Sequence, residues 1–496
     1  MNNIPPLART CNGDLQGLRD GTVCAWLGVP YAQPPVGDLR FREAEPARPW
    51  HGMREATACG AACPQNVRGS GKSLGTSQSE DCLTLNIWSP APGPGKRPVM
   101  VWIHGGAFME GSARIYEGAH LAAQGDIVVV TLNYRVGVLG FANFGEALQD
   151  PRSPGNLGLR DQIAALRWVR ENIFAFGGDP DRVTIAGESA GATSVALLMV
   201  ATDAKPLFHG AIMQSGSFTM IHDRDASLKL AKLYLELLGA ATLAPLQALP
   251  VAALLAAQTA VKARMPHSFA ASPWFDSALL PATVAAARDA PTADVPLLAG
   301  FNRDEIRLFA RAGGVFEPFF SRPRMAALLQ SQLGEAETER VLGPYPPTRQ
   351  GTLQLGTDLL FAMPTLHFAE RHAKRHPTWF YRFDCGNPLI GAAHGLELLY
   401  LWEPRGIAYM LMRGAPLLGR RLALATRMRS HWIAFIRDGR PASDWLAFEA
   451  NRRTTLIFDK LDQLTYDPEH ERRVAWAGRD ATRGETREAP LPANLS

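Results

Sequence analysis

A serine between two glycines is the feature of this 496-residue chain best suited to chemistry. Ser189 stands in Gly187-Glu188-Ser189-Ala190-Gly191, between the strand-like run 182–186 and the helix-forming run 193–200. These flanking runs predict a sharp strand-to-helix turn that holds the hydroxyl clear of a sheet. The glycines fit such a turn because a Cβ at either position would crowd the neighbouring strand and helix. A serine presented in this way is suited to nucleophilic attack on a carbonyl carbon.

The five-residue pattern alone is a weak signal, because the chain contains it twice. Gly71-Lys72-Ser73-Leu74-Gly75 matches equally well, but it lies within 68–77, a run of turn-forming residues with no strand before it and no helix after it. That copy predicts a mobile surface loop. The structural context therefore favours Ser189.

A serine hydroxyl is a poor nucleophile near neutral pH and needs a histidine base oriented by an acid. Among twelve histidines, His394 is the best candidate, because it lies in a small-residue loop, 391–395, beyond the predicted strand 379–383. Asp304 and Glu305 follow the predicted strand 295–300 and give the chain order serine, acid, histidine. Adjacent side chains point in different directions, so only one carboxylate should reach the imidazole.

Hydrogen-bond donors for the oxyanion have a source in His104-Gly105-Gly106-Ala107-Phe108, which follows the predicted strand 99–103. A Gly-Gly pair after a strand is by itself often an ordinary tight turn. Combined with the serine turn, it predicts that N–H groups of this loop face the site, together with that of Ala190 at the start of the next helix.

The elements that must position these residues alternate along the chain. Amphipathic helical periodicity at 161–173 is typical of a helix that covers a sheet. Such a pattern predicts an α/β fold with a mostly parallel sheet covered on both faces. We expect one domain over 1–496, with helical insertions at about 222–290 and 307–370 and a loosely held tail after about 470. The predicted strands are 99–103, 127–134, 182–186, 210–215, 295–300, 378–383 and 455–458.

Composition excludes several classes of protein. A net charge of +4 is too small to favour nucleic acid binding, and no apolar stretch of about 20 residues predicts a membrane span. The first nine residues lack an apolar signal core, so we expect a cytoplasmic protein unless a leader was removed. Six cysteines without a paired C-x-x-C pattern predict reduced thiols and no metal site. A monomer or weak homo-oligomer is expected.

Beyond these features, the chain resembles the type-B carboxylesterase family, the cholinesterase-like branch of the α/β-hydrolases that includes bacterial p-nitrobenzyl esterases. Four motifs carry the resemblance, and together they are far more specific than the serine pattern. They are Gly28-Val29-Pro30-Tyr31-Ala32-Gln33-Pro34-Pro35-Val36-Gly37-Asp38-Leu39-Arg40-Phe41, Ser79-Glu80-Asp81-Cys82-Leu83-Thr84-Leu85-Asn86-Ile87-Trp88, Asn133-Tyr134-Arg135-Val136-Gly137 and Gly155-Asn156-Leu157-Gly158-Leu159-Arg160-Asp161-Gln162.

The resemblance implies hydrolysis of a carboxylic ester through an acyl-enzyme, without a cofactor. It implies Glu305, rather than Asp304, as the acid beside Ser189 and His394. It also implies a set of supporting features: oxyanion donors at Gly106, Ala107 and Ala190, an ion pair between Arg40 and Glu80, and polar support near the base from Glu188 and Ser215.

Some positions depart from the family pattern. Ile306 stands where glycine usually follows the acid, and Leu396 stands where serine usually lies two positions after the histidine. The family often pairs the cysteines that correspond to Cys63 and Cys82, which we expect to stay reduced here. The segment between them contains no aromatic residue, which argues against a choline ester hydrolase.

The expected substrate is a small or aromatic ester in an apolar pocket, with Phe108 and Phe309 as candidate walls. The same machinery would serve an amidase, a carbamate hydrolase or a thioesterase, and a specialised toxin or drug esterase is a further alternative. No apolar lid of an interfacial lipase is evident. A catalytically silent interaction module is the alternative from another class, but such proteins lack a working nucleophile.

Overall fold

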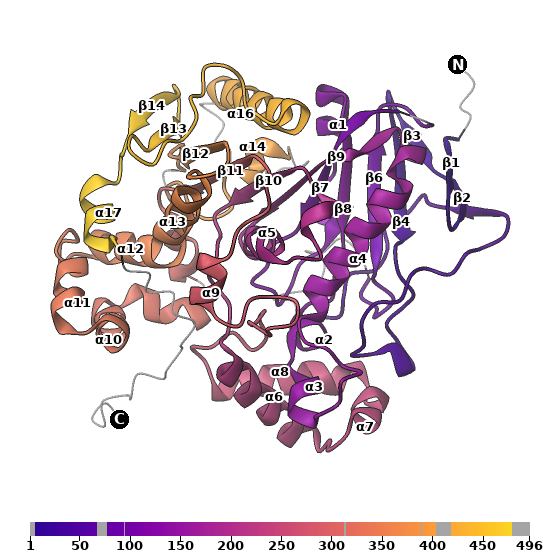
Figure 1. Ribbon diagram of the computed structural model, residues 1–496, viewed down its shortest axis with the longest axis horizontal. Coiled ribbons are helices and arrows are strands. Elements are labelled where there is room, and N and C mark those ends of the chain that lie inside the picture. The colour runs from indigo at the N-terminus through magenta and orange to yellow at the C-terminus, as the bar shows by residue number, and fades with distance from the viewer. Residues whose placement is uncertain are drawn as a thin grey trace.

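The computed structural model describes residues 5–66, 77–93, 95–311, 314–387, 389–402 and 418–478. The described strands form an 11-stranded sheet in the order β14-β13-β12-β11-β10-β9-β7-β8-β6-β4-β3, with a separate three-stranded sheet, β1-β2-β5 (Figure 1). The serine pattern at 71–75 lies outside the described residues.

The centre of the large sheet is parallel, as the apolar runs predicted. Each strand from β8 through β13 in the sheet order pairs in parallel with its neighbour. These strands are buried on both faces, which is why their sequences are apolar without strict alternation. They are β7 (Arg97–Ile103), β8 (Val128–Leu132), β9 (Gly178–Glu188), β10 (Gly210–Gln214), β11 (Leu297–Asn302), β12 (Thr378–Phe383) and β13 (Thr454–Phe458).

Antiparallel strands extend this core at both edges. At one edge β14 pairs with β13, and at the other β6, β4 and β3 continue from β8. The sequence analysis did not predict these edge strands, which are short or lie within the family motifs. They are β3 (Leu18–Asp20), β4 (Val23–Pro30), β6 (Thr84–Ser89) and β14 (Gln463–Tyr466), and the small sheet contains β1 (Leu7–Thr10), β2 (Gly13–Gln16) and β5 (Met53–Glu55).

Helices cover both faces of the sheet, and β7 shows how the faces are divided. Val99 and Val101 pack in the larger core cluster, which includes side chains of α4 (Leu157–Asn172) and α5 (Ala190–Val200). Met100 and Trp102 point to the opposite face, where a second cluster includes side chains of α1 (Ala119–Gly125), α14 (Leu398–Leu401) and α16 (Leu418–Asp438). Alternate residues of β7 thus pack into separate cores on the two faces of the sheet.

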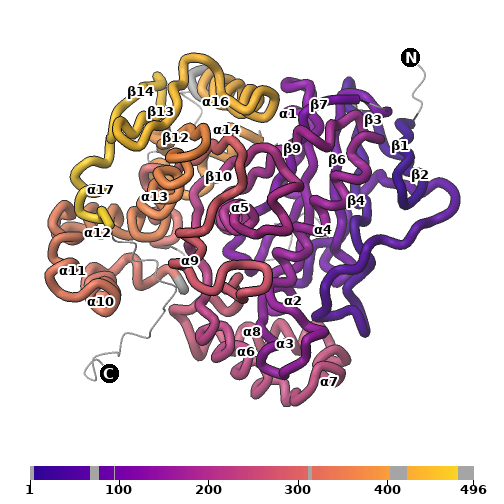
Figure 2. The backbone as a smooth tube through the Cα atoms, in the orientation of Figure 1, coloured from indigo at the N-terminus to yellow at the C-terminus, as the bar shows by residue number. Residues whose placement is uncertain are grey.

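Further helices lie beyond the sheet, in the segments expected to be insertions. Figure 2 shows that, of the first segment (222–290), the helices of 224–264 lie at one end of the molecule and that, of the second segment (307–370), the helices of 322–342 lie at another. The first group contains α6 (Arg224–Leu238), α7 (Leu243–Ala248), α8 (Val251–Arg264) and α9 (Val284–Asp289). The second contains α10 (Arg322–Leu333), α11 (Glu335–Leu342), α12 (Arg349–Thr357), the π-helix η9 (Asp358–Ala362) and α13 (Met363–His372). Two short helices, α2 (Gly137–Phe141) and α3 (Phe144–Leu148), precede α4.

The C-terminal part of the chain is packed against the fold to a later residue than expected. The boundary of about 470 falls at the start of α17 (His470–Trp476), and Trp476 is buried, with its indole N–H 2.8 Å from the hydroxyl of Tyr345. Residues 479–496 lie outside the described range. Within the described residues, none of the helices combines the length and apolar composition that a bilayer span requires.

The expected ion pair between Arg40 and Glu80 is confirmed. The guanidinium donates from Nε and Nη2 to the two carboxylate oxygens at 2.6 Å each. Its Nη1 also donates to the backbone oxygens of Gln247 and Leu249, which ties the N-terminal motif to the first group of added helices. Cys63 and Cys82 are free thiols, as expected.

Candidate active site

Ser189 lies at the turn between β9 and α5, at the carboxyl edge of the parallel sheet. Its φ of 58° and ψ of −122° are a strained conformation for a residue with a Cβ. The flanking positions have no space for a side chain. A Cβ at Gly187 would lie 2.5 Å from the backbone of Gly191, and a Cβ at Gly191 would lie 2.1 Å from the oxygen of Ile103. The Ser189 N–H donates to the oxygen of Gln214 on β10 at 2.9 Å, which fixes the turn.

The loop after β7 lies directly against this turn. A Cβ on Gly105 would lie 3.1 Å from the Cβ of Ser189, so the loop and the serine are in close contact. Gly106 and Ala107 have φ angles of 113° and 54°, and the Gly106 oxygen accepts the N–H groups of Met109 and Glu110. Within the described part of the chain, no acceptor takes the N–H of Gly106, Ala107 or Ala190. These three donors are therefore available to a ligand.

His394 and Glu305 meet in a buried contact. The imidazole Nδ1 lies 2.6 Å from Oε2 of Glu305, whose other oxygen accepts the backbone N–H of Asn302 at 2.7 Å. The backbone N–H of His394 also donates to the backbone oxygen of Glu305 at 3.3 Å. Glu305 is fully buried and His394 is 9% exposed. This geometry fixes the imidazole tautomer with its proton on Nδ1.

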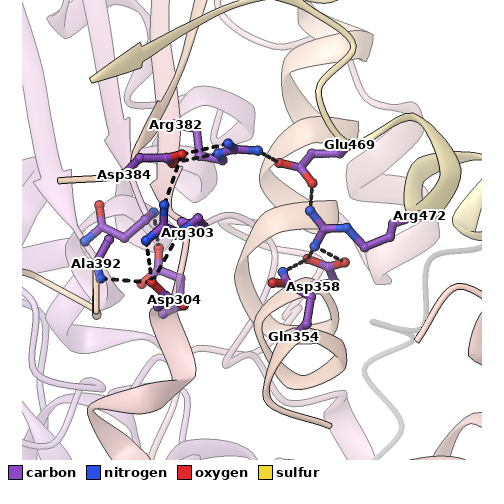
Figure 3. A network of polar contacts seen from close by, with 11 residues as sticks. Arg303, Asp304, Gln354, Asp358, Arg382, Asp384, Ala392, Glu469 and Arg472 are labelled. Carbon is purple, nitrogen blue, oxygen red and sulfur yellow. Dashed lines mark hydrogen bonds and ion pairs between the residues drawn. The ribbon is translucent and has the colours of Figure 1, made fainter. Parts of the chain in front are cut away.

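Asp304, the other candidate acid, points elsewhere. Its carboxylate accepts the backbone N–H of Ala392 at 3.0 Å and forms an ion pair with Arg303 (Figure 3). A second ion pair joins it to Arg307. The structure thus brings Glu305, and not Asp304, to the ring of His394.

The second ring nitrogen of His394 faces Glu188. Nε2 lies 3.1 Å from Oε1 of Glu188, but neither atom has a hydrogen-bond partner among the described residues, and Ser189 Oγ is not bonded to the ring. Catalytic hydrogen bonds are often long in enzymes without substrate. Nε2 is the nitrogen that a base would use.

Three buried carboxyl groups surround the imidazole and shift its protonation. Burial alone would lower the pKa of His394, but the facing carboxylates of Glu188 and Glu305 outweigh it and raise the pKa to about 9. Burial raises the pKa of Glu188 to about 8, although His394 opposes this shift. Burial and the charge of Glu305 raise the pKa of Glu397 to about 7. The cluster therefore holds protons near neutral pH that free side chains would release.

The sequence analysis missed Glu397, which lies three residues after His394. Its carboxylate accepts hydrogen bonds from the amide of Asn302 and, at 3.2 Å, from that of Gln214. The signal was available, because a titratable residue one helical turn after a candidate base lies close to it. Ser215, the other expected supporting residue, is buried with φ 55°, but its Oγ has no hydrogen-bond partner among the described residues.

Aromatic rings pack on the other side of His394. Phe309 and Phe361 have ring centroids 5.0 and 4.6 Å from that of the imidazole, and Phe309 is partly exposed. Ile306 fills the space between these rings and the neighbouring helices, where the family usually has glycine. Leu396 is buried in the second core cluster. These two departures therefore add apolar packing around the histidine loop.

The expectation for Phe108 is corrected. This side chain is fully buried in the main core and packs edge-to-face on Phe141, with centroids 5.0 Å apart. Ala107 and Phe108 both adopt positive φ, so the loop turns sharply here. Phe108 is a core residue and not a pocket wall in this structure.

A mostly parallel sheet that carries a serine at a strained strand-to-helix turn, with a histidine and an acid on later loops, defines the α/β-hydrolase fold. The chain belongs to the carboxylesterase family, whose sequence profile matches residues 5–475. It is a serine hydrolase of the carboxylesterase class.

Known proteins are similar to this chain in sequence and structure over nearly its whole length. The chain is 38% identical over 491 residues to the para-nitrobenzyl esterase of Bacillus subtilis, covering 94% of this chain and 97% of that protein. It is 35% identical over 486 residues to the phenmedipham hydrolase of Pseudarthrobacter oxydans, covering 91% of this chain and 94% of that protein. A solved PNB esterase structure superimposes with a TM-score of 0.84 at 35% identity, covering 95% of this chain and 99% of that one. The structure of carboxylesterase EST55 from Geobacillus stearothermophilus superimposes with a TM-score of 0.83 at 34% identity. The match covers 95% of this chain and 100% of that one.

Proposed function

We propose that this chain hydrolyses carboxylic esters through a triad of Ser189, His394 and Glu305. The observation that carries the proposal is the 2.6 Å contact between His394 Nδ1 and Glu305 Oε2, which leaves Nε2 free near the serine turn. An imidazole held in this tautomer can accept the Ser189 proton and share the resulting charge with the carboxylate.

The reaction follows from the available groups. Ser189 Oγ attacks the ester carbonyl while His394 Nε2 takes its proton, and the N–H groups of Gly106, Ala107 and Ala190 bind the oxyanion. The imidazolium then protonates the leaving alkoxide, which yields the acyl-enzyme. Water repeats the sequence and releases the acid. Each preorganised donor of this kind contributes about 3 kcal/mol to stabilisation of the transition state.

Small or aromatic esters are the substrates that the site favours. Phe309 and Phe361 present ring faces and edges beside His394, and Phe309 stacks on Phe316 with centroids 4.0 Å apart. An apolar acyl or alcohol group packed there would gain about 25 cal/mol per Å² of apolar surface removed from water. The names of the relatives from Bacillus and Pseudarthrobacter are consistent with aromatic substrates of this kind.

Hydrolysis of a series of p-nitrophenyl esters of increasing chain length, with wild type and Ser189→Ala, tests the proposal. We expect the substitution to lower kcat by about four to six orders of magnitude on every ester, because the nucleophile is lost. Short-chain esters should give the highest kcat/KM. Activity that survives in a folded Ser189→Ala protein would contradict the assignment of the nucleophile.

A further inference from the structure

Asp304 is a buried carboxylate that the proposed reaction does not use. It is 8% exposed and directly precedes Glu305, yet it points to the other side of the chain. The Asp304 N–H donates to the oxygen of Ala392 at 2.9 Å, and its carboxylate accepts the N–H of the same residue at 3.0 Å. Both polar groups of the Ala392 backbone are thus bound by one residue, two positions before His394.

These bonds belong to a longer contact between the acid-bearing loop and the histidine-bearing loop. Asn302 donates from its side chain to the backbone oxygen of Ala393 at 2.8 Å, and the backbone oxygen of Glu305 accepts the His394 N–H at 3.3 Å. The Asp304 bonds are made to Ala392, the residue that directly precedes these two in the histidine loop. Three consecutive residues of the histidine loop, 392–394, are therefore each bound by a residue of the segment that carries the acid.

The packing at Gly391 shows how tightly the Asp304 carboxylate is seated. A Cβ on Gly391 would lie 2.5 Å from Oδ2 of Asp304 and 2.7 Å from Nη1 of Arg307. Gly391 also has a φ of 67°, which only glycine adopts without strain. The loop therefore approaches the carboxylate as closely as a backbone can.

The carboxylate is in turn fixed by charge. Arg303 pairs with Asp304 at 3.2 Å and with Asp384 at 3.4 Å, and Arg307 adds a contact at 3.6 Å. From Asp384 the ion pairs continue toward the C-terminal helix α17 (Figure 3). The continuing chain is Arg382, Glu469, Arg472 and Asp358.

We propose that Asp304 is a positioning residue for the triad: by binding both the N–H and the oxygen of Ala392, it holds the His394 ring on Glu305. This inference rests on the proposed function. Asp304 touches no reacting atom and acts only through the histidine loop. The charged groups that face it are Arg303 and Arg307, and those that face His394 are Glu188, Glu305 and Glu397.

Asp304→Ala is the first test, with Asp462→Ala as a matched control. Asp462 pairs with Arg427 through two bonds of 2.6 and 2.9 Å and contacts neither loop of the triad. We expect Asp304→Ala to lower kcat by about 10- to 100-fold with little change in KM, because the ring is misplaced. The acid limb of the kcat/KM profile should also move to lower pH, because a loosened contact with Glu305 stabilises the imidazolium less. The control should change neither.

Gly391→Ala tests the same contact without removing the carboxylate. The added Cβ should displace Asp304 and give the same fall in kcat and the same shift of the acid limb. Gly239→Ala is its control, because Gly239 has a similar φ of 61° but nothing within 4 Å of the new Cβ. Asp304→Asn should recover part of the activity lost in Asp304→Ala, because the amide oxygen can still accept the Ala392 N–H.

Two results would overturn the proposal. One is that folded Asp304→Ala and Gly391→Ala behave like their controls in kcat and pH profile. The other, which needs no activity, is that the downfield Nδ1–H proton resonance of His394 is unchanged in these variants; we expect it to move or broaden. Failure of the esterase proposal itself would be recognised separately, since wild type would then be inactive or Ser189→Ala active.

Discussion

At the scale of single residues, the environment of one imidazole decides the chemistry. His394 meets Glu305 through Nδ1 and faces Glu188 through Nε2, and a third carboxyl group, that of Glu397, lies in the same buried cluster. The carboxylates stabilise the imidazolium that forms when Ser189 loses its proton. They also make the imidazolium of the resting enzyme harder to deprotonate, and this sets the lower pH limit of activity.

Glu188→Gln should move that limit. A carboxylate near the ring raises the pKa of His394, so its removal lowers the pKa, and the base becomes free at lower pH. We expect the acid limb of the kcat/KM profile to shift to lower pH relative to wild type. A rate profile measured in a constant-ionic-strength buffer series checks this. An unchanged or upward-shifted limb would show that Glu188 does not act on the imidazole.

Most of the reacting residues could be predicted from the sequence, because each stands in a distinctive local context. Ser189 and the Gly106 loop follow apolar strands, and His394 lies among small residues after another strand. Local pattern could not choose between Asp304 and Glu305, because the direction of a side chain depends on the tertiary path of the loop. It also gave no role to Asp304, whose partner at Ala392 lies 88 residues away.

At the scale of elements, the strained serine turn depends on close backbone approach. The carbonyl of Ile103 at the end of β7 occupies the space beside Gly191 at the start of α5. Helix α5 is buried along its whole length between the sheet and α4, so the turn cannot relax by moving the helix outward. Apolar runs predicted these central elements well. The antiparallel edge strands were missed because β3 and β14 are short, whereas β6 and the end of β4 lie in segments analysed only as family motifs.

Gly191→Ala should therefore damage both stability and activity. Its Cβ would lie 2.1 Å from the Ile103 oxygen, and overpacking of this kind costs about 1–3 kcal/mol of the free energy of unfolding. Gly343→Ala is the control, because the nearest atom would be 3.4 Å away. Urea unfolding midpoints and kcat on a short p-nitrophenyl ester measure the two effects. Equal behaviour of the two variants would contradict the steric account of the turn.

At the scale of the whole molecule, buried ion pairs connect segments that are distant in sequence. Arg135, after β8, binds Asp161 on α4 through bonds of 2.8 and 2.7 Å, and both side chains are almost fully buried. Arg40 similarly pairs with Glu80 of the second motif and donates to a backbone oxygen in the first group of added helices. All four residues belong to the family motifs. Their positions could therefore be taken from the resemblance, whereas composition alone did not indicate that they form pairs.

Arg135→Met should be strongly destabilising. It leaves the Asp161 carboxylate buried without its partner, and loss of one member of a buried pair costs about 3–5 kcal/mol. Arg264→Ala breaks an exposed pair with Glu236, for which the cost should be below about 1 kcal/mol. Thermal and urea unfolding of both variants at one pH compare the two costs. Similar losses would show that burial of the Arg135 pair does not govern its contribution.

The central claim, that Ser189 is the nucleophile, is tested most directly by covalent labelling with diethyl p-nitrophenyl phosphate followed by peptide mass spectrometry. We predict that wild type gains a diethylphosphoryl group on the peptide that contains Ser189, in step with loss of esterase activity, and that Ser189→Ala gains none. A phosphoryl group on a different residue in an inactivated protein, or full activity after complete labelling of Ser189, would contradict the account.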